Sequence, residues 1–351
     1  MDPLRQTLIL LSWIFGWLLF WKLRFLAKEK TPFSPRVSVI VPARNEEKNI
    51  GSLLRSLERQ TYKNFEVIVV NDNSEDATEK VVSSFDVKLV NLRGDPPEGW
   101  VGKSWACWNG YLSSEGDVLI FLDADVELQE EALESLVSTL LREGGLVSVW
   151  PYQRFEKLYE HLTLPFNLVA IGAMGSFSVF KTKPTGAYGP AMATSRKDYE
   201  EVGTHEVSKD SVIEDVALGK KFLEKGYKVN NYLGGELIRF RMYPNGFKEL
   251  FEGFTKNMAL GAASAGLNSL FLFLWIVGLY SSLFNLLELP HWYLLFAAQL
   301  YVVSRRTGDY SLLDALLYPV HFLFFLCVFL FSIFRVLFLK NVAWKGRRIR
   351  V

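Results

Sequence analysis

The stretch "LIFLDADVEL", residues 119–128, changes from consecutive aliphatic residues to acids at every second position. Its first half predicts a buried strand. Acids are almost never fully buried unless they are paired, so Asp123 and Asp125 are unexpected at the end of such a strand. If the chain stays extended, the two side chains point to the same side. We therefore expect a site here, where both carboxylates meet a cationic partner.

Similar β-rich runs occur on either side of this stretch. Five strands are expected, at 37–41, 65–71, 87–92, 117–123 and 146–150. Helical segments separate them, at 47–59, 75–85, 102–114 and 130–142. Strands that alternate with helices indicate right-handed βαβ units and a mostly parallel sheet. Such sheets bind ligands at the carboxyl ends of their strands.

Polar side chains follow three of these strands. Pro42 cannot donate to a strand ladder, so the first strand ends there and leaves Asn45 and Glu46 on the loop above the sheet. Asp72 follows the second strand, and the two acids of "LDAD" follow the fourth. One such residue is commonly a helix cap or a turn residue, but three at one edge favour a ligand site. Carboxylate oxygens suit a hard divalent ion, Mg²⁺ or Mn²⁺, which could hold a diphosphate.

The composition limits the class of protein. Hydrophobic residues make up 50% of the 351 residues and charged residues only 22%, which is too apolar for an ordinary soluble domain. The net charge of +1 argues against nucleic acid as a partner, because phosphate binding needs a cationic excess. Cys107 and Cys327 lie far apart in unlike surroundings, which indicates neither a disulfide framework nor a zinc site. We therefore expect the active part to work in a reducing compartment.

The apolar residues gather at both ends of the chain. Residues 7–26 are long enough to cross a bilayer, and no signal-peptide cleavage site follows them, so we expect an uncleaved transmembrane anchor within 1–30. Within 267–339, the segments 267–289 and 312–339 are long enough to span, whereas 290–303 is short. It is either a thin third span or a re-entrant piece.

The charges that flank these segments predict their orientation. Lysines and arginines follow the first span and fill the tail, 340–351, so both regions should be cytoplasmic. If both regions are cytoplasmic, the chain between them must cross the membrane an even number of times. This favours a re-entrant 290–303, although Arg305 and Arg306 would then lie on the outer side of the membrane. The sequence thus predicts a multi-pass plasma-membrane protein with a cytoplasmic catalytic domain.

The motifs together resemble a known family. "VSVIVPARNEEKNIGSLLRSLERQTYKNFEVIVVNDNSEDAT" (37–78) and "GDVLIFLDADV" (116–126) are similar to the nucleotide-sugar half of family 2 glycosyltransferases with the GT-A fold, over about 36–235. The resemblance implies a nucleotide-sugar donor, usually a UDP-sugar. It also implies the following roles: Pro42, Ala43, Asn45 and Glu46 line the nucleoside, Asp72 hydrogen-bonds the base, and Asp123 and Asp125 carry the metal.

Two further segments resemble the carotenoid and hopanoid branch of that family. In "GWVGKSWACWNGY" (99–111) the resemblance implies that Lys103 lies near the diphosphate. The alternative is a solvated lysine at a helix start. The ending "NVAWKGRRI" (341–349) resembles the Trp-Lys-Gly-Arg ending of the same lipid-directed branch.

A second carboxylate cluster lies in "DSVIEDVALGKKFLEKGYKV", residues 210–229. Ser211 and Glu214 form a capping-box pattern, and Asp215 falls in the first helical turn, where the helix N-terminus favours its ionised form. An ionised carboxylate beside an acceptor hydroxyl can act as a general base. The resemblance assigns Asp215, beside Glu214, this role in an inverting single displacement. The alternative is an acid that only complements the helix dipole.

The acceptor is inferred from apolar surfaces. Segment 162–180 is apolar but interrupted by Pro165, and we expect it at the membrane surface. Residues 236–266, with Lys248 and Lys256, predict interfacial amphipathic helices beside anionic headgroups, with ordinary core helices as the alternative.

A motif of processive synthases is missing from this chain. "RFRMYPNGF" (239–247) stands where they carry Gln-x-x-Arg-Trp, although Arg239 and Arg241 could still meet phosphates. We therefore expect a single-sugar transfer to a membrane lipid. The alternatives are a polyprenyl-phosphate glycosyltransferase, a polysaccharide synthase, a nucleotidyltransferase or a noncatalytic membrane scaffold.

Overall fold

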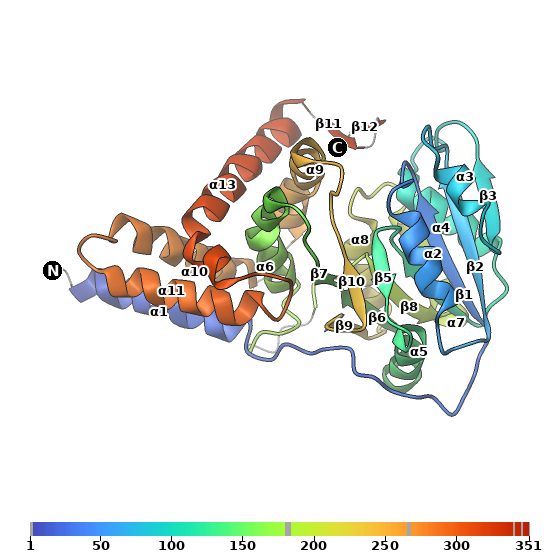
Figure 1. The fold of residues 1–351 in the computed structure, drawn as a ribbon, viewed down its shortest axis with the longest axis horizontal. Helices are drawn as coiled ribbons and strands as arrows, with labels where there is room; N and C mark the ends of the chain where they lie inside the picture. The colour runs from blue at the N-terminus through green and yellow to red at the C-terminus, as the bar shows by residue number, and fades with distance from the viewer. Residues whose placement is uncertain (1–2, 180–183, 265–267, 340, 345–346, 351) are drawn as a thin grey trace.

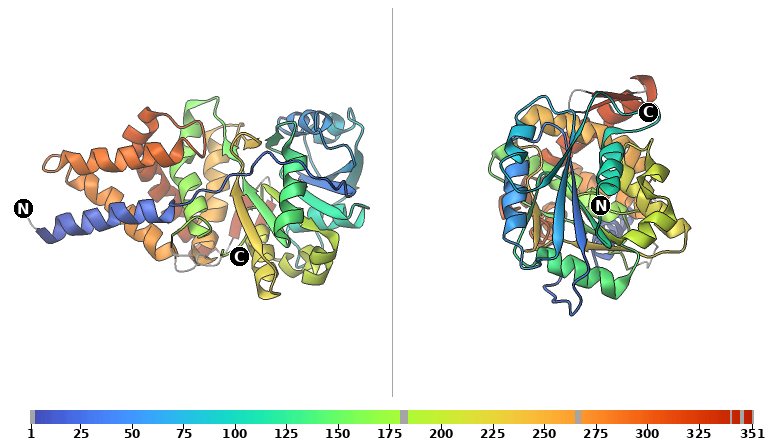
Figure 2. Two further views of the ribbon diagram at one scale, coloured as in Figure 1. Left: turned by 90° about the horizontal axis from the view of Figure 1, so that it is seen from below. Right: turned by 90° about the vertical axis from the view of Figure 1, so that its right-hand side faces the viewer.

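The computed structural model describes residues 3–179, 184–264, 268–339, 341–344 and 347–350. A sheet domain forms one end of the molecule and a helical bundle forms the other, and the N-terminus lies at the far end of the bundle (Figures 1 and 2). The sheet domain is built from residues 37–240, apart from the helix at 164–173, which belongs to the helical part.

The main sheet has seven strands in the order β3-β2-β1-β4-β8-β6-β9. Their bounds are β1 Val37–Ala43, β2 Phe65–Asp72, β3 Lys88–Leu92, β4 Val118–Leu122, β6 Leu146–Trp150, β8 Ala191–Ser195 and β9 Val229–Leu233. Neighbouring strands are parallel from β3 to β4 and between β6 and β9, whereas β8 is antiparallel to both of its neighbours. The prediction of a mostly parallel α/β sheet is confirmed.

Helices cover both faces of this sheet because its strands are apolar on both sides. In β1, Val39 and Val41 join the core beneath one face, and Ile40 joins the core beneath the other. The first core includes α2 (Ile50–Glu58) and α5 (Ala132–Glu143); the second includes α4 (Gly102–Leu112), α7 (Arg196–Val202) and α8 (Glu214–Glu224). The short helix α3 (Thr78–Val82) follows β2.

A second, smaller sheet lies beside the carboxyl ends of the main strands. It consists of β5 (Val126–Leu128), β10 (Ile238–Phe240) and β7 (Tyr152–Gln153). Between β4 and β5 the chain turns, and Val126 N donates to Asp123 O at 3.2 Å. The expectation that Asp123 and Asp125 lie on an extended strand is therefore wrong, since both lie in this turn.

Among the described residues, the helical part contains seven further helices. They are α1 Pro3–Leu19, α6 Leu164–Ala173, α9 Phe247–Ser264, α10 Asn268–Phe284, α11 Pro290–Ser304, α12 Leu312–Leu316 and α13 Tyr318–Phe334. Shorter helical turns are η1 (Leu158–Thr163), η2 (Thr204–Ser208) and the π-helical η3 (Arg335–Leu339), and the chain ends in the hairpin of β11 (Asn341–Trp344) and β12 (Arg347–Arg350).

α1, α10 and α11 pack together through small and polar residues. Gly16 of α1 lies against Trp275 and Gln299, and Trp275 Nε1 donates to Gln299 Oε1 at 2.8 Å. Gln299 Nε2 in turn donates to Trp13 O at 2.8 Å. Residues 290–303 thus belong to α11, a helix packed beside two others. Its role as a thin span or as a re-entrant piece stays a prediction.

The first helix is also shorter than predicted. α1 ends at Leu19 because the chain beyond it joins the sheet domain, where Leu26 N donates to Leu233 O at 2.8 Å. Among the described residues, one helix, Tyr318–Phe338, is long and apolar enough to cross a bilayer, and α1 and α10 are apolar but shorter. The spans expected at 7–26 and 267–289 are therefore helices of 17 residues each.

The segment expected at the membrane surface forms an internal helix instead. In α6 the side chains of Phe166, Leu168 and Ile171 are buried, and Asn167 Oδ1 accepts from Trp150 Nε1 of β6 at 2.5 Å. α6 therefore connects the sheet domain to the helical bundle. Residues 236–264, the described part of the region predicted to hold interfacial helices, contain β10 and then the helix α9.

Candidate functional site

A cavity of about 1570 Å³ extends from the carboxyl edge of the main sheet into the helical bundle. It has a charged end, formed by loops after β1, β2 and β4 with the N-termini of α4 and α8, and an apolar end, formed by α6, α9, α10 and α13. Nine of the ten predicted site residues line it: Pro42, Ala43, Glu46, Asp72, Lys103, Asp123, Asp125, Glu214 and Asp215.

Asn45 is the predicted residue that does not line this cavity. Its side chain accepts a hydrogen bond from Glu75 N at 2.8 Å, and its own N–H donates to Ser74 Oγ at 3.0 Å. Asn45 adopts φ 53°, a left-handed conformation that asparagine tolerates better than most residues. It therefore joins the loop after β1 to the loop after β2.

Lys103 joins the two carboxylate clusters. Its Nζ lies 2.7 Å from Asp123 Oδ1 and 2.9 Å from Glu214 Oε1. Burial alone would lower the pKa of Lys103, but the charges of Asp123 and Glu214 hold this pKa well above its usual value. Burial likewise opposes ionisation of Glu214, and Lys103 with Lys256 holds the pKa of Glu214 below its usual value.

One alternative and one expectation about this cluster need correction. The alternative of a solvated Lys103 is wrong, because two carboxylates bind its ammonium group. The capping box of Ser211 and Glu214 is absent, because α8 begins at Glu214 itself, its N-cap is Ile213, and no side chain caps it. The Glu214 side chain pairs with Lys103 instead.

Asp215 occupies the first turn of α8, as predicted. Burial, together with the charge of Glu214, raises its pKa to about 7. A Cβ on Gly189 would lie 2.5 Å from Asp215 Oδ2, so only a glycine lets the carboxylate sit in this position. Gly189 was not among the predicted site residues. A glycine before Pro190, in a segment without helical or strand periodicity, was the signal available.

The donor atoms at the charged end are compatible with a divalent metal ion. Asp123 and Asp125 both line the cavity, and in the described part of the chain no cluster of three or more His, Cys, Asp or Glu could hold an ion. Mg²⁺ is typically bound by one or two carboxylates with waters and substrate phosphates completing its shell. The two carboxylates therefore fit a hard divalent ion that arrives with a phosphate ligand.

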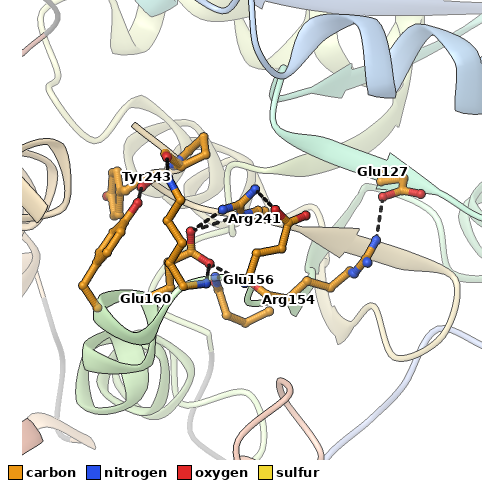
Figure 3. Close-up of polar contacts among 10 residues, drawn as sticks. Glu127, Arg154, Glu156, Glu160, Arg241 and Tyr243 are labelled. Carbon is orange, nitrogen blue, oxygen red and sulfur yellow. Dashed lines mark hydrogen bonds and ion pairs between the residues drawn. The ribbon is translucent and has the colours of Figure 1, made fainter. Parts of the chain in front are cut away.

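The third acid of the opening stretch does not belong to the site. Glu127 pairs with Arg154 of the chain after β7 at 3.1 Å (Figure 3). Arg241 forms ion pairs with Glu156 and Glu160 (Figure 3). These ion pairs connect the chain after β10 to η1 and the residues just before it. The expectation that Arg241 meets phosphates is therefore wrong, since two carboxylates already bind its guanidinium group.

Arg44 lines the cavity but was not among the predicted site residues. Its Nη1 donates to Asp72 O at 2.8 Å and to Asn73 O at 3.0 Å, so it fixes the loop after β2 at the charged end of the cavity. Its position inside the quoted motif "PARNEE" was the available signal.

The apolar end opens between two helices. α13 begins against α10, where the hydroxyls of Tyr318 and Ser282 are 2.6 Å apart, and it then diverges toward α9, where Ser332 Oγ donates to Thr255 O (Figure 1). Phe273 and Val277 of α10 and Leu326 of α13 line the cavity, yet they are 61%, 41% and 36% exposed. The cavity therefore reaches the outer surface of the bundle between α10 and α13.

Comparison with known proteins places this geometry in a family. The model of Glycosyl transferase family 2 matches residues 38–203. A 4,4'-diaponeurosporenoate glycosyltransferase of Staphylococcus haemolyticus (strain JCSC1435) is 35% identical over 97% of this chain and 96% of its own. The chain belongs to glycosyl transferase family 2. The enzyme of the same description from Staphylococcus aureus (strain USA300) is 33% identical to this family 2 glycosyltransferase, over 100% of this chain and 98% of its own.

A solved structure shares the fold of this family 2 glycosyltransferase. The mannosyltransferase PcManGT from Pyrobaculum calidifontis, in complex with GDP-Man and Mn²⁺, has a TM-score of 0.58 and 18% sequence identity, over 96% of each chain. At this identity the likeness shows the fold alone. The predicted GT-A architecture is confirmed.

Proposed function

We propose that this glycosyltransferase transfers a single sugar from a nucleotide-sugar to the polar end of a long, apolar lipid. The observation that carries the proposal is the continuity of one cavity, which joins a carboxylate-rich end at the sheet to an apolar end among the helices. Such a cavity lets a water-soluble donor and a membrane-soluble acceptor meet.

The donor is proposed to bind at the charged end. Pro42, Ala43 and Glu46 would line the nucleoside, and Asp72 would hydrogen-bond the base, for which uracil is our proposal. Asn45 would act indirectly, since its contacts hold the two loops together. Ligand binding at the carboxyl ends of parallel strands supports this placement.

Asp125 and Asp123 are proposed to hold Mg²⁺ or Mn²⁺ with the donor's diphosphate. When bound, the ion would neutralise the negative charge of the departing nucleoside diphosphate. Lys103 lies between Asp123 and Glu214, from where its ammonium group can add a second positive charge near the diphosphate. The Mn²⁺ bound in the PcManGT complex supports a divalent ion in this fold.

Asp215 is proposed to be the catalytic base. The acceptor oxygen attacks the anomeric carbon, the bond from that carbon to the diphosphate oxygen breaks, and the electron pair leaves with the nucleoside diphosphate. Attack from the face opposite the leaving group inverts the anomeric configuration. When the acceptor is a hydroxyl, Asp215 takes its proton, and a pKa of about 7 suits that transfer near neutral pH.

The acceptor is proposed to enter from the membrane between α10 and α13. The two relatives are named for 4,4'-diaponeurosporenoate, whose name ends as that of a carboxylate, and the apolar half of the cavity suits a long apolar acid. We propose that the outer face of the bundle contacts lipid, in a multi-pass plasma-membrane protein with a cytoplasmic sheet domain. The face is rich in exposed apolar side chains: Leu4, Leu8, Leu270, Phe273, Leu294, Leu323, Leu330 and Phe334.

A transfer assay tests the proposal. Detergent-purified protein is mixed with a panel of UDP- and GDP-sugars, with Mn²⁺ or EDTA, and with or without a long-chain apolar acid. We expect metal-dependent release of a nucleoside diphosphate that rises with the acid, and a glycosylated product by mass spectrometry. Release of no nucleoside diphosphate from any donor, by protein with an intact thermal transition, would contradict the proposal and favour a noncatalytic role.

A further inference from the structure

Two helices of the bundle, α1 and α11, run toward the sheet domain and end beside it. They lie side by side, and Gln299 Nε2 of α11 donates to Trp13 O of α1 at 2.8 Å (Figure 1). α1 ends where the chain joins the sheet domain, and α11 ends where Gln153 N of β7 donates to Thr307 O at 3.0 Å. The junction between bundle and sheet domain is therefore built from the ends of both helices.

The exposed side chains of both helices change in character at this junction. The exposed apolar residues are Leu4, Leu8, Leu10 and Leu11 on α1 and Leu294, Leu295 and Val302 on α11. After α1 follow Trp21, which is 66% exposed, and the exposed Lys22, and after α11 follow the exposed Arg305 and Arg306. Apolar surface followed by tryptophan and cations is typical of the boundary between lipid chains and water.

Aromatic rings hold the two arginines after α11 in place. The guanidinium carbon of Arg306 lies 5.1 Å from the centre of the Phe25 ring, and that of Arg305 lies 5.3 Å from the centre of the Tyr301 ring. Arg305 Nη1 also donates to the Tyr301 hydroxyl at 3.5 Å. Neither arginine forms an ion pair with a carboxylate in the described part of the chain. Stacking orients a guanidinium group and leaves its edge, which carries the N–H donors, open to an anion.

Arg239 adds a third cation from the sheet domain. It lies on β10 opposite Tyr152 of β7, and its Nε is buried without a hydrogen-bond partner among the described residues. Burial and the charge of Asp309 raise the pKa of Tyr152 to about 12, and the charges of Arg239 and Arg305 oppose that effect. Arg239 and Arg305 thus approach the same tyrosine. We call Arg239, Arg305 and Arg306 the junction arginines.

Two acids beside the junction arginines already have partners. Glu127 lies opposite Arg239 on β5 and pairs with Arg154 at 3.1 Å. Asp309 hydrogen-bonds to Tyr152. Even with both carboxylates counted, Arg154 and the junction arginines leave an excess of positive charge on this surface, and such a surface attracts anions.

We propose that the junction arginines bind the phosphate group of an anionic phospholipid at the membrane surface. This inference rests on the proposed function in one respect, because it takes from it the placement of the bundle in lipid. Guanidinium groups donate paired hydrogen bonds to phosphate oxygens, and anionic lipids attract basic residues at the surface of a bilayer. Arg305 and Arg306 then lie on the side of the sheet domain, in agreement with the rule that cytoplasmic segments are rich in lysine and arginine.

The test counts the lipids that the full chain retains in mild detergent, by native mass spectrometry. The probes are phosphatidylglycerol and phosphatidylcholine with the same acyl chains. Arg305→Gln/Arg306→Gln removes two charges, Arg305→Lys/Arg306→Lys keeps them, and Arg55→Gln/Arg59→Gln, which removes two exposed arginines at α2, is the matched control. Each variant is used with an intact thermal transition.

We expect the wild type and the control to prefer phosphatidylglycerol, and the double glutamine variant to lose this preference by about 25-fold, or about fivefold for each arginine. The double lysine variant should keep part of the preference, because it keeps the charge but not the paired donors. Phosphatidylglycerol should also raise the melting temperature of the wild type, and inorganic phosphate at the same concentration should not.

The outcomes separate this inference from the proposed function. Equal retention of both lipids by the wild type, or an unchanged preference in the double glutamine variant, overturns the inference. A rise in melting temperature that inorganic phosphate produces as well as the lipid also overturns it, because the site then takes free phosphate. Transfer in detergent is a separate readout: the double glutamine variant should keep the wild-type KM for donor and acceptor. A wild type that is inactive with every donor but still retains phosphatidylglycerol would contradict the proposed function alone.

Discussion

Asp215→Asn should separate hydroxyl acceptors from anionic acceptors. The substitution keeps the shape of the side chain but removes its capacity to accept a proton near neutral pH. With a hydroxyl acceptor the transfer rate should fall by about 10²- to 10⁴-fold, which is the usual contribution of a general base. With an anionic acceptor no proton has to be removed, so the rate should fall less than about tenfold, a fraction of that contribution.

The raised pKa adds a pH signature to this prediction. With a pKa of about 7, Asp215 is ionised to roughly a tenth at pH 6 and to roughly nine tenths at pH 8. Wild-type transfer to a hydroxyl acceptor should therefore rise about tenfold between these pH values, as the ionised base increases. The anionic acceptor should show no such rise, and Asp215→Asn should remove it for the hydroxyl.

The assay follows product by mass spectrometry at saturating donor, from pH 6 to 8, with both acceptors. Glu224→Gln is the matched control, because Glu224 lies at the other end of α8 and pairs with Lys221 at the surface at 2.7 Å. Equal losses with both acceptors, or an unchanged pH profile in Asp215→Asn, would refute the role of Asp215 as a base.

Three further changes test the geometry of the site. Gly189→Ala places a Cβ 2.5 Å from Asp215 Oδ2, so transfer should fall at least tenfold with little change in melting temperature. The control is Gly51→Ala, which should be neutral because the nearest atom to its Cβ is 3.3 Å away at the end of a flexible arginine. Equal activity in both variants would contradict the argument. Lys103→Met leaves two carboxylates without their cation, which should lower the free energy of unfolding by about 1–3 kcal/mol in denaturant titrations; unchanged stability would show that water screens the cluster. EDTA should abolish transfer, and Asp125→Asn should raise the Mn²⁺ concentration needed for half-maximal rate; transfer that persists in EDTA would exclude the metal role.

The main sheet was predictable because its signals are local. Strands such as Val37–Ala43 are short, apolar and bounded by turn residues, and their alternation with helices fixes a parallel arrangement. The gathering of Asp72, Asp123 and Asp125 at one cavity followed from that topology alone. Asp215 in the first turn of α8 followed from the helical spacing of the residues after it.

The features that were missed depend on contacts between distant parts of the chain. The pairing of Lys103 with Glu214 joins two helices, and it replaced a capping box that looked complete from local sequence. The strand β8 is antiparallel to both of its neighbours, which no local pattern encodes. α6 was predicted to be interfacial because it is apolar, but a buried helix between the sheet domain and the bundle has the same composition.

The bundle was predicted less well than the sheet for a physical reason. Hydropathy identifies an apolar segment but does not say where its helix ends, and α1 ends at Leu19 because residues near Leu26 pair with the sheet domain. Lys256 is a similar case. A lysine among phenylalanines is typical of an interfacial helix, and only the positions of α6 and α13 turn its surroundings into a cavity.

The most direct test of the central claim is transfer of a radiolabelled sugar from its nucleotide-sugar donor to a long apolar acid by the purified protein. We expect a labelled product that partitions into organic solvent, that depends on Mn²⁺ and that needs a higher Mn²⁺ concentration in Asp125→Asn. Label that stays entirely in the water phase, with donor consumed, would show that the enzyme transfers sugar to water or to a soluble acceptor, and would contradict the role given to the apolar end of the cavity.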